Sequence, residues 1–394
     1  MSISYKIYDS FENLDITAWD TVNKNSTAND SLGMEPDFLL SIENSMSQYT
    51  RLWYVIFYST KGEPVSSACI STLSVDLAIL SSGVLQKVIS FVRSILPSFL
   101  YMKILFCGTP VSLGQIGVQF TNQADPERVL KELDSILTKL AEKSKSKVIV
   151  HKECEGKDLD KMAPLYELGY RRADSLDMHV FTKKFEGFPD YLSGLNSHYR
   201  YDIKRSLKKL AKNGVEIKRY SNSEEICRIY TNGLYEMYLD VVSRSETQLE
   251  ILPREFFIGM SNRYADEISL TLLEKDGKVL AYNWSLNHDG KYHFLFCGID
   301  YGNNKKYDLY FNLMYAELGF ALDAKPDQIY VGQTASTFKM RLGCKQEPLY
   351  LFVKPQGLVY KGILSMLFKY LFPPKQELTA PAIFNSTYSS DLSQ

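Results

Sequence analysis

The sequence has almost no net charge and no paired cysteines. Its 45 lysine and arginine residues balance 46 aspartate and glutamate residues, which leaves a net charge of −1. A general electrostatic attraction to nucleic acid is therefore absent, so any basic patch must be local and no DNA partner is expected. The six cysteines stand singly, without a C-x-x-C pair, which favours reduced thiols over a disulfide framework.

The first residues also lack a targeting signal. The stretch MSISYKIYDSFENLD has neither the basic start nor the apolar run of a signal peptide. We therefore expect a cytoplasmic protein.

Several catalytic motifs are missing as well. There is no G-x-x-x-x-G-K-[ST] phosphate loop, no dinucleotide fingerprint and no Gly-x-Ser-x-Gly nucleophile motif. The five histidines show no H-x-x-x-H spacing, and no neighbouring cysteine completes a zinc set. These absences argue against nucleotide hydrolysis, dinucleotide redox chemistry and a serine nucleophile, and we predict no metal site.

No apolar run is uninterrupted enough to span a membrane. The best candidate, residues 84–106, contains Gln86, Lys87, Arg93 and Pro97, so we expect no transmembrane segment there. A second apolar stretch, GLVYKGILSMLFKYLFPPKQ, is expected to form a packed helix near the carboxyl terminus. Contact with a membrane surface or an acyl chain is the alternative for both segments.

A repeat divides the chain. The tetrapeptide LFCG occurs at Leu105–Gly108 and again at Leu295–Gly298. Each copy follows an apolar strand, a glycine-containing turn and a second strand, and precedes a loop, a helix-period stretch and a short β-rich run. A Leu-Gly pair and another strand close both series. The repeated order indicates a tandem duplication of one domain.

We therefore predict an α+β protein with two tandem domains, each a mixed, largely antiparallel sheet flanked by helices. The expected parts are a first domain at 1–185 with an apolar insertion at 84–100, a basic inter-domain helix at 186–220, a second domain at 221–372 and a loosely ordered tail at 373–394.

The segment between the repeats is strongly basic. Residues 200–219 carry eight lysine or arginine residues and two acidic ones. An amphipathic helix of this charge is either a solvated face or a site for phosphate or another anion. Arg200 and Arg205 are the candidate substrate-binding residues.

The order of elements in each copy resembles the core of the GNAT acyltransferase superfamily. More closely, the chain is similar to the tandem-GNAT proteins related to the Fem-type peptidoglycan aminoacyltransferases and their FemAB-like relatives. The resemblance covers about 34–355. It is carried by MEPDFLLSIENS, HYRYDIKRSLKKLAKNGVEI, DGKVLAYNWSLNHDGKYHFLFCGID and GQTASTFKMRLG.

The resemblance implies transfer of an activated acyl group to an amine, with the donor bound after the second LFCG. A glycine-bearing loop that feeds a helix N-terminus is a ready anion site. Here that segment is IDYGNNKKYD, without the usual Gln/Arg-x-x-Gly-x-Gly/Ala signature. This departure points to an altered donor, such as an acyl carrier protein or a charged tRNA, and an ordinary surface turn is the alternative. The candidate donor-binding residues are Gly298, Gly302, Asn303, Asn304, Lys305 and Lys306.

Acyl transfer from a thioester to an amine needs a proton acceptor, oxyanion stabilisation and good geometry, but no covalent nucleophile. Asp300 and His293 are candidate proton acceptors. The alternative for Asp300 is a loop-capping role, and the alternative for His293 is a buried histidine whose hydrogen bonds are satisfied within the strand. Cys297 is interpreted as a small packing residue.

By the resemblance, Lys339 in GQTASTFKMRLG corresponds to a lysine at the acyl-transfer centre of Fem-type enzymes. It is expected to steady negative charge on the carbonyl oxygen, and a surface lysine is the alternative. Gln333 and Thr334 of the same segment are expected to add hydrogen bonds. Tyr282 and Trp284 either line the channel or pack in the core.

These observations favour a cytoplasmic N-acyltransferase without a permanently bound cofactor. It would move an acyl group, preferably fatty acyl, from acyl-CoA or an acyl carrier protein to an amine of a lysine-like or ornithine-like side chain or a peptide. The donor is expected near 292–306 and the acceptor in the cleft between the domains. The alternatives are a Fem-like transferase that uses charged tRNA, a non-catalytic binding protein and a membrane-surface role.

Overall fold

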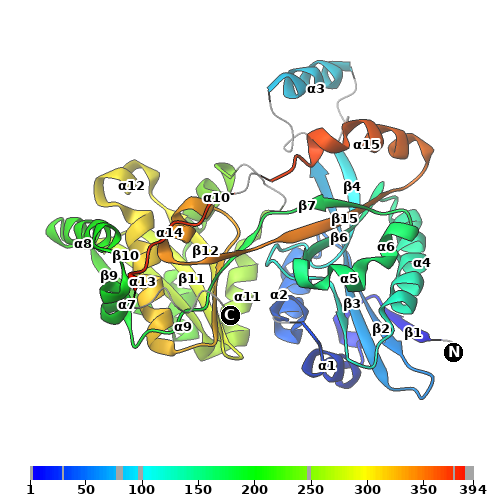
Figure 1. Cartoon of the computed structure of the whole chain (residues 1–394), viewed down its shortest axis with the longest axis horizontal. Coiled ribbons are helices and arrows are strands. Elements are labelled where there is room, and N and C mark those ends of the chain that lie inside the picture. Colours follow the sequence, from blue (N-terminus) through cyan, green and yellow to red (C-terminus); the bar gives the residue numbers. More distant parts are fainter. Residues whose placement is uncertain are drawn as a thin grey trace. The chain divides into compact units, whose positions relative to one another are not determined.

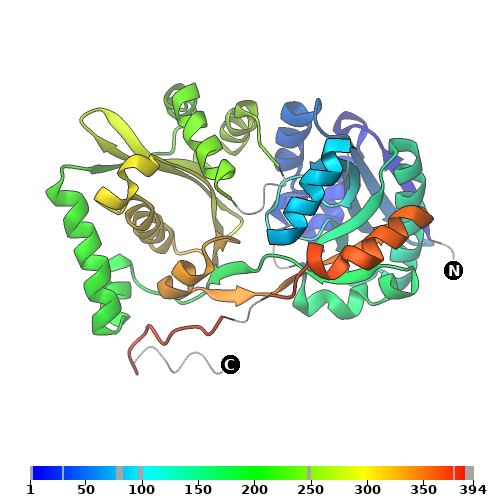
Figure 2. The ribbon, with the colours of Figure 1, turned by 90° about the horizontal axis from the view of Figure 1, so that it is seen from above.

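The computed structural model describes residues 3–28, 31–76, 83–95, 101–245, 250–375 and 378–386. The chain forms two compact units, drawn in Figure 1 and from above in Figure 2. Unit 1 comprises Met1–Leu176, Glu246–Phe256 and Pro348–Gln376, and unit 2 comprises Asp177–Ser245, Phe257–Glu347 and Glu377–Gln394. Each unit contains a mixed sheet with helices against it, so the expected α+β class is confirmed.

The sheet of unit 1 contains mostly antiparallel pairs and one central parallel pair, β4 with β6. Strand β2 has the sequence LWYVIFY and is buried almost throughout, as expected for a strand that is covered on both faces. In order across the sheet the strands are β1 (Ser4–Tyr8), β2 (Leu52–Tyr58), β3 (Pro64–Asp76), β4 (Tyr101–Cys107), β6 (Val148–Glu155), β15 (Leu349–Pro355) and β7 (Arg171–Asp174), and β5 (Val118–Phe120) pairs with β3.

Helix α4 shows how local sequence sets the elements of unit 1. Asp125 caps its N-terminus by accepting a hydrogen bond from the Arg128 backbone, and Pro126 stands in the first turn. Its apolar stripe, which includes Val129 and Leu133, is buried against the sheet. The helices of unit 1 are α1 (Ile16–Lys24), α2 (Pro36–Met46), α3 (Gly83–Ile95), α4 (Pro126–Ser144), α5 (Leu159–Met162), α6 (Pro164–Glu167) and α15 (Leu358–Leu371).

The sheet of unit 2 repeats the same plan, with the parallel pair formed by β12 and β13. The expected hairpin turn is present: Asp276 and Gly277 both have positive φ, the geometry of a two-residue turn. In order across the sheet the strands are β14 (Lys345–Glu347), β8 (Met178–Phe181), β13 (Gln328–Gly332), β12 (Lys291–Ile299), β11 (Lys278–His288), β10 (Ile268–Lys275) and β9 (Glu216–Tyr220).

Helix α13 is the central helix of unit 2 and packs on β10, β11 and β12. Buried side chains of this helix and of the sheet form one apolar cluster. The helices of unit 2 are α7 (Phe188–Gly194), α8 (Ser197–Lys212), α9 (Ser223–Ile229), α10 (Asn232–Ser243), α11 (Arg254–Tyr264, whose first turn belongs to unit 1), α12 (Tyr301–Tyr307), α13 (Leu309–Ala324) and α14 (Ser336–Leu342).

The two repeats exchange their last strands. The first repeat ends with β7 and β8, and the second ends with β14 and β15. Strand β8 lies between β13 and β14 in unit 2, whereas β15 lies between β6 and β7 in unit 1. Each sheet is therefore completed by a strand from the other repeat.

This exchange moves the boundaries away from those expected from the sequence. The segment Pro348–Gln376, expected in the second domain, packs in unit 1 because β15 pairs there. Residues 177–185, expected in the first domain, belong to unit 2. The insertion forms α3, whose Ile89 is buried on unit 1, while residues 96–100 lie outside the described residues.

Two further expectations are corrected. The basic helix α8 is not a connector between domains, because it packs on α13 within unit 2. The tail is not loose throughout: Ile383 and Phe384 are buried in the core of unit 2, and Phe384 forms a β-bridge with Leu195.

Candidate active site

An opening in the strand pairing of unit 2 lies between β12 and β13. These parallel strands pair only from Lys291 to His293, although β12 continues to Ile299. A register shift beside Trp284 in the pairing of β11 with β12 marks the place where β12 bends away. Beyond His293, no described strand pairs with the edge of β12 that faces β13. The residues 295–297 are partly exposed, whereas most of the strand is buried.

Lys339 brings an amino group to this opening. It lies on α14, which follows β13, and only 4% of its surface is exposed. Its Nζ lies beside Gly332 at the end of β13, where an added Cβ would be 3.2 Å from the nitrogen. Burial lowers the pKa of Lys339 to about 8, and the neighbouring ionisable groups that act on it are the thiols of Cys344 and Cys297 rather than a carboxylate. The amine is thus buried and cationic at neutral pH.

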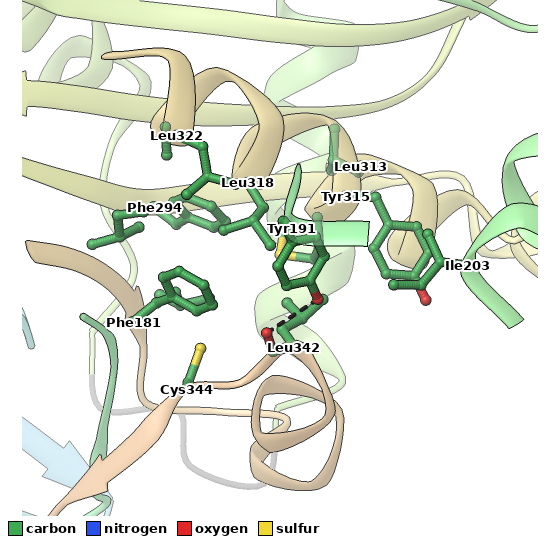
Figure 3. Close-up of a cluster of buried hydrophobic side chains, with 14 of the residues drawn as sticks. Phe181, Tyr191, Ile203, Phe294, Leu313, Tyr315, Leu318, Leu322, Leu342 and Cys344 are labelled. Carbon is green, nitrogen blue, oxygen red and sulfur yellow. Dashed lines mark hydrogen bonds between the residues drawn. The ribbon is translucent and has the colours of Figure 1, made fainter. Parts of the chain in front are cut away.

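Packing fixes the helix that carries this lysine. Tyr191 donates a hydrogen bond of 3.1 Å from its hydroxyl to the carbonyl oxygen of Leu342, and both residues are buried. Figure 3 shows them in one apolar cluster with Phe181, Phe294 and Cys344. These contacts hold α14 against the sheet.

His179 is a second polar residue at the opening, and it was not among the residues predicted from the sequence. It lies on the exchanged strand β8, and its Nδ1 is 2.9 Å from the carbonyl oxygen of Gly332. Because a carbonyl can only accept, Nδ1 carries the proton and Nε2 is an acceptor. Burial first, and then the charge of Lys339, lower the pKa of His179 to about 4. The ring is therefore neutral, and Nε2 has no hydrogen-bond partner among the described residues.

The thiols beside Lys339 are not activated. Burial raises the pKa of Cys297 to about 11 and that of Cys344 to about 12. Both thiols are therefore protonated at neutral pH and unsuited to nucleophilic chemistry. This agrees with the interpretation of Cys297 as a packing residue.

The segment expected as a phosphate loop is instead the short helix α12. Asp300 caps it and receives hydrogen bonds from the backbone and side-chain amides of Asn303, at 3.3 and 2.9 Å. Lys278 forms an ion pair of 3.0 Å with the same carboxylate. Burial alone would raise the pKa of Asp300, but these hydrogen bonds and Lys278 together hold it below its usual value. The structure thus gives Asp300 a capping role.

The other residues of this segment are engaged locally. Asn304 accepts a hydrogen bond of 3.0 Å from the backbone N–H of Tyr310 in α13. The carbonyl oxygen of Lys305 accepts one of 2.8 Å from Lys209. Lys306 lies over the ring of Tyr307. Gly302 is part of α12.

Four predicted residues pack inside unit 2. Tyr282 donates a hydrogen bond of 2.8 Å to the carbonyl oxygen of Leu234, and Trp284 is almost fully buried. Gly298 fits beneath the Tyr282 ring, because an added Cβ would lie 2.2 Å from it. His293 stacks on Tyr330 with ring centroids 5.0 Å apart.

A pocket of about 210 Å³ borders α14 on the side of Phe338, the neighbour of Lys339 in sequence. Of the two predicted arginines, Arg205 lines it, whereas Arg200 donates a hydrogen bond to the carbonyl oxygen of Ser193. Gln333 and Thr334 lie in the turn between β13 and α14. The pocket is lined by Tyr199, Asp202, Ile203, Arg205, Ser206, Asp308, Phe311, Tyr315, Phe338 and Arg341.

The corresponding place in unit 1 is closed. Strands β4 and β6 stay paired up to Cys107, the last residue of β4. The loop that follows is held by Lys152, whose Nζ donates hydrogen bonds to the carbonyl oxygens of Thr109 and Val111 at 3.2 and 3.3 Å. In unit 1 the buried lysine is therefore satisfied by the protein's own loop, whereas Lys339 of unit 2 is buried beside the place where β12 and β13 stop pairing.

Two mixed sheets of one plan, one of them splayed beside a buried lysine, define a tandem GNAT-type acyltransferase fold. Residues 98–345 match the model of the FemAB-like family, described as peptidoglycan biosynthesis/recognition. The chain belongs to the FemAB-like family. It is a transferase of the acyl-transferring type that this family and fold define.

Solved structures show the same fold at low sequence identity. FemX superposes with a TM-score of 0.56 at 10% identity, over 93% of this chain and 100% of FemX. A tandem GNAT protein from the clavulanic acid biosynthesis pathway gives 0.55 at 11%, over 90% and 99%. The C-terminal domain of a protein assigned as a lysylphosphatidylglycerol synthetase from Agrobacterium fabrum gives 0.53 at 10%, over 94% and 100%. No curated protein matches the chain in sequence.

Proposed function

We propose that unit 2 catalyses transfer of an acyl group from a thioester donor to an amine in the opening between β12 and β13. The observation that carries this proposal is Lys339, a buried ammonium group on which no carboxylate of the described residues acts, at the end of a splayed parallel pair. Such a group is costly to bury and stabilises negative charge that develops beside it.

In the proposed reaction the amine nitrogen attacks the carbonyl carbon, and the carbon–nitrogen bond forms as the carbon–sulfur bond breaks. Lys339 stabilises the oxyanion of the tetrahedral intermediate. The acceptor Nε2 of His179 orients the attacking N–H by a hydrogen bond, since its low pKa makes it a poor base. The amine proton leaves with the thiolate. None of these steps needs a covalent enzyme intermediate.

For the donor we favour a phosphopantetheine thioester, as in acyl-CoA or an acyl carrier protein. The edge of β12 beyond His293, where its pairing with β13 ends, offers backbone groups to the amide bonds of such an arm. Arg205 and Arg341 at the neighbouring pocket, which Asp202 and Asp308 also line, supply hydrogen-bond donors for its phosphate. The aromatic richness of the chain, with 27 tyrosine and 21 phenylalanine residues, favours a longer acyl chain than acetyl. The acceptor would be a lysine-like or ornithine-like side chain or a peptide amine.

A charged tRNA is the second candidate donor, and two observations favour it. The chain belongs to the FemAB-like family. In addition, Asp300 fills the N-terminus of α12, where a CoA pyrophosphate would otherwise find free N–H groups.

The test is a transfer assay with purified protein. Acyl-CoA thioesters from acetyl to palmitoyl, acylated carrier protein and aminoacyl-tRNA are each offered with a panel of amines, with and without ribonuclease. We expect Lys339→Met to lower kcat/KM by about 100-fold or more. Lys184→Ala, which removes an exposed lysine of the same unit, is expected to leave it unchanged.

Activity that ribonuclease abolishes would show that the donor is a charged tRNA and not a thioester. No transfer from any donor, or full activity in Lys339→Met, would refute the proposed function.

A further inference from the structure

Helices α3 and α15 of unit 1 form one surface feature, although they are distant in sequence. Both lie over the same sheet of unit 1, side by side in Figures 1 and 2. Ile89 of α3 and Leu364, Phe368 and Leu371 of α15 belong to one buried cluster with side chains of β3 and β4. One face of each helix is therefore already used for packing.

The opposite face of α15 remains apolar. Four large hydrophobic side chains are exposed there: Leu358 by 87%, Val359 by 70%, Met366 by 72% and Tyr370 by 66%. A helix that is packed on one side ordinarily has charged and polar residues on the other. Here the solvent-facing side contains large apolar groups between lysines.

The outer face of α3 has the same character. Phe91 and Ile95, one helical turn apart, are each 70% exposed. Monomeric soluble proteins rarely expose a contiguous group of this kind, and one that is rimmed by polar residues marks a site of interaction. Together the exposed faces of α3 and α15 form the apolar surface considered below.

The charge of this surface has a single sign. Neither helix contains an aspartate or glutamate, and they contribute Lys87, Arg93, Lys361 and Lys369. Two basic residues outside these helices also contact α15: Arg171 of β7 lies over the ring of Phe368 at 4.0 Å, and Lys147, which precedes β6, lies over Tyr360 at 5.4 Å.

We propose that the outer faces of α3 and α15 bind an anionic lipid bilayer, with the helices lying in the membrane interface. Exposed aromatic and aliphatic groups between lysines on amphipathic helices are the features that such binding needs. A second copy of this chain is a poorer occupant, because its own surface has the same positive sign. Within the described residues no helix is both long and apolar enough to cross a membrane. Membrane binding is independent of the reaction chemistry in unit 2.

The test is vesicle flotation of the full chain, with phosphatidylcholine vesicles compared with vesicles that also contain phosphatidylglycerol. We expect binding to the anionic vesicles that weakens as salt is raised. Lys361→Gln with Lys369→Gln should weaken it by about 30-fold, since each lysine near an anionic surface contributes about fivefold. Phe91→Asp with Met366→Asp should abolish it.

Tyr49→Asp is the matched control, because Tyr49 is an apolar side chain of unit 1 that is 63% exposed but not on these helices. It should bind as the unaltered protein does, and unchanged melting temperatures would show that all variants fold. The proposal is overturned if the unaltered protein does not float with anionic vesicles, or if the Phe91 and Met366 variant floats equally well. It is also overturned if these substitutions instead dissociate a dimer detected by light scattering.

Discussion

Lys339 combines a functional position with an unfavourable environment. Its ammonium group is buried, and its pKa is lowered from 10.5 to about 8. The unfolded chain keeps its proton up to the higher value, so below pH 8 the folded state bears the full desolvation cost. The contribution of Lys339 to stability should therefore become less unfavourable as the pH rises from 8 to 10.5, whereas the raised pKa values of the buried thiols of Cys297 and Cys344 act in the opposite direction above pH 9.

Lys339→Met should consequently stabilise the protein at neutral pH while it removes activity. The gain is bounded by about 3 kcal/mol, the energy equivalent of the lowered pKa, and chemical denaturation with urea would measure it. The difference between variant and wild type should shrink as the pH is raised above 8. A variant that is less stable than wild type at neutral pH would contradict this account of the lysine.

Asp300 should behave as a structural cap. Asp300→Ala removes the hydrogen bonds from Asn303 and the ion pair with Lys278. We expect a loss of about 1 kcal/mol of stability, typical of an N-cap, and a kcat/KM within about threefold of wild type. Because the folded-state pKa is lowered, the stability from Asp300 is present at neutral pH and is lost as the pH falls through that pKa. If Asp300→Ala instead loses activity and has an altered pH profile, Asp300 acts as the proton acceptor.

At the scale of single elements, α14 determines where the lysine lies. The hydroxyl of Tyr191 holds the end of this helix through the carbonyl of Leu342. Tyr191→Phe leaves that buried carbonyl without this donor, so we expect a cost of about 1 kcal/mol and a several-fold lower kcat from a displaced Lys339.

Tyr170→Phe is a matched control for that substitution. It removes a hydroxyl hydrogen bond of 2.8 Å to Asp134 in unit 1, and should cost similar stability without lowering kcat. Equal kinetic effects of the two substitutions would show that α14 is not positioned in this way. Thermal denaturation and steady-state kinetics together provide the measurement.

The segment IDYGNNKKYD illustrates why an element can be misjudged from sequence. Glycine and asparagine are weak helix formers, so the composition of this stretch predicts a loop. The structure makes it α12, with the Asp300 cap inside the segment and the distant Lys209 bonded to the carbonyl of Lys305. The cap was visible in the sequence, whereas the contact with α8 was not.

At the scale of the whole molecule, the strand exchange makes the two repeats depend on one another. A fragment of residues 1–185 lacks β15, and a fragment of residues 186–394 lacks β8, so each would leave a sheet with an unpaired internal edge. We expect each fragment to be insoluble or unfolded alone and soluble when both are coexpressed. Circular dichroism and gel filtration would test this. Two independently folded fragments would contradict the exchanged topology.

Some of this protein is determined by the sequence alone. The repeated order of turns, apolar strands and amphipathic helices predicted two α+β domains of one plan, because turn chemistry and hydrophobic periodicity are local properties. Lys339 was also identified from the sequence, through a motif shared with a family. The tertiary structure alone decided which sheet each final strand joins. The local sequences of β8 and β15 predict a strand, but they do not specify the sheet in which that strand pairs. The tertiary structure also decided that His179 lies beside Gly332 and that unit 2 is open where unit 1 is closed, because these features arise from contacts between residues far apart in the chain.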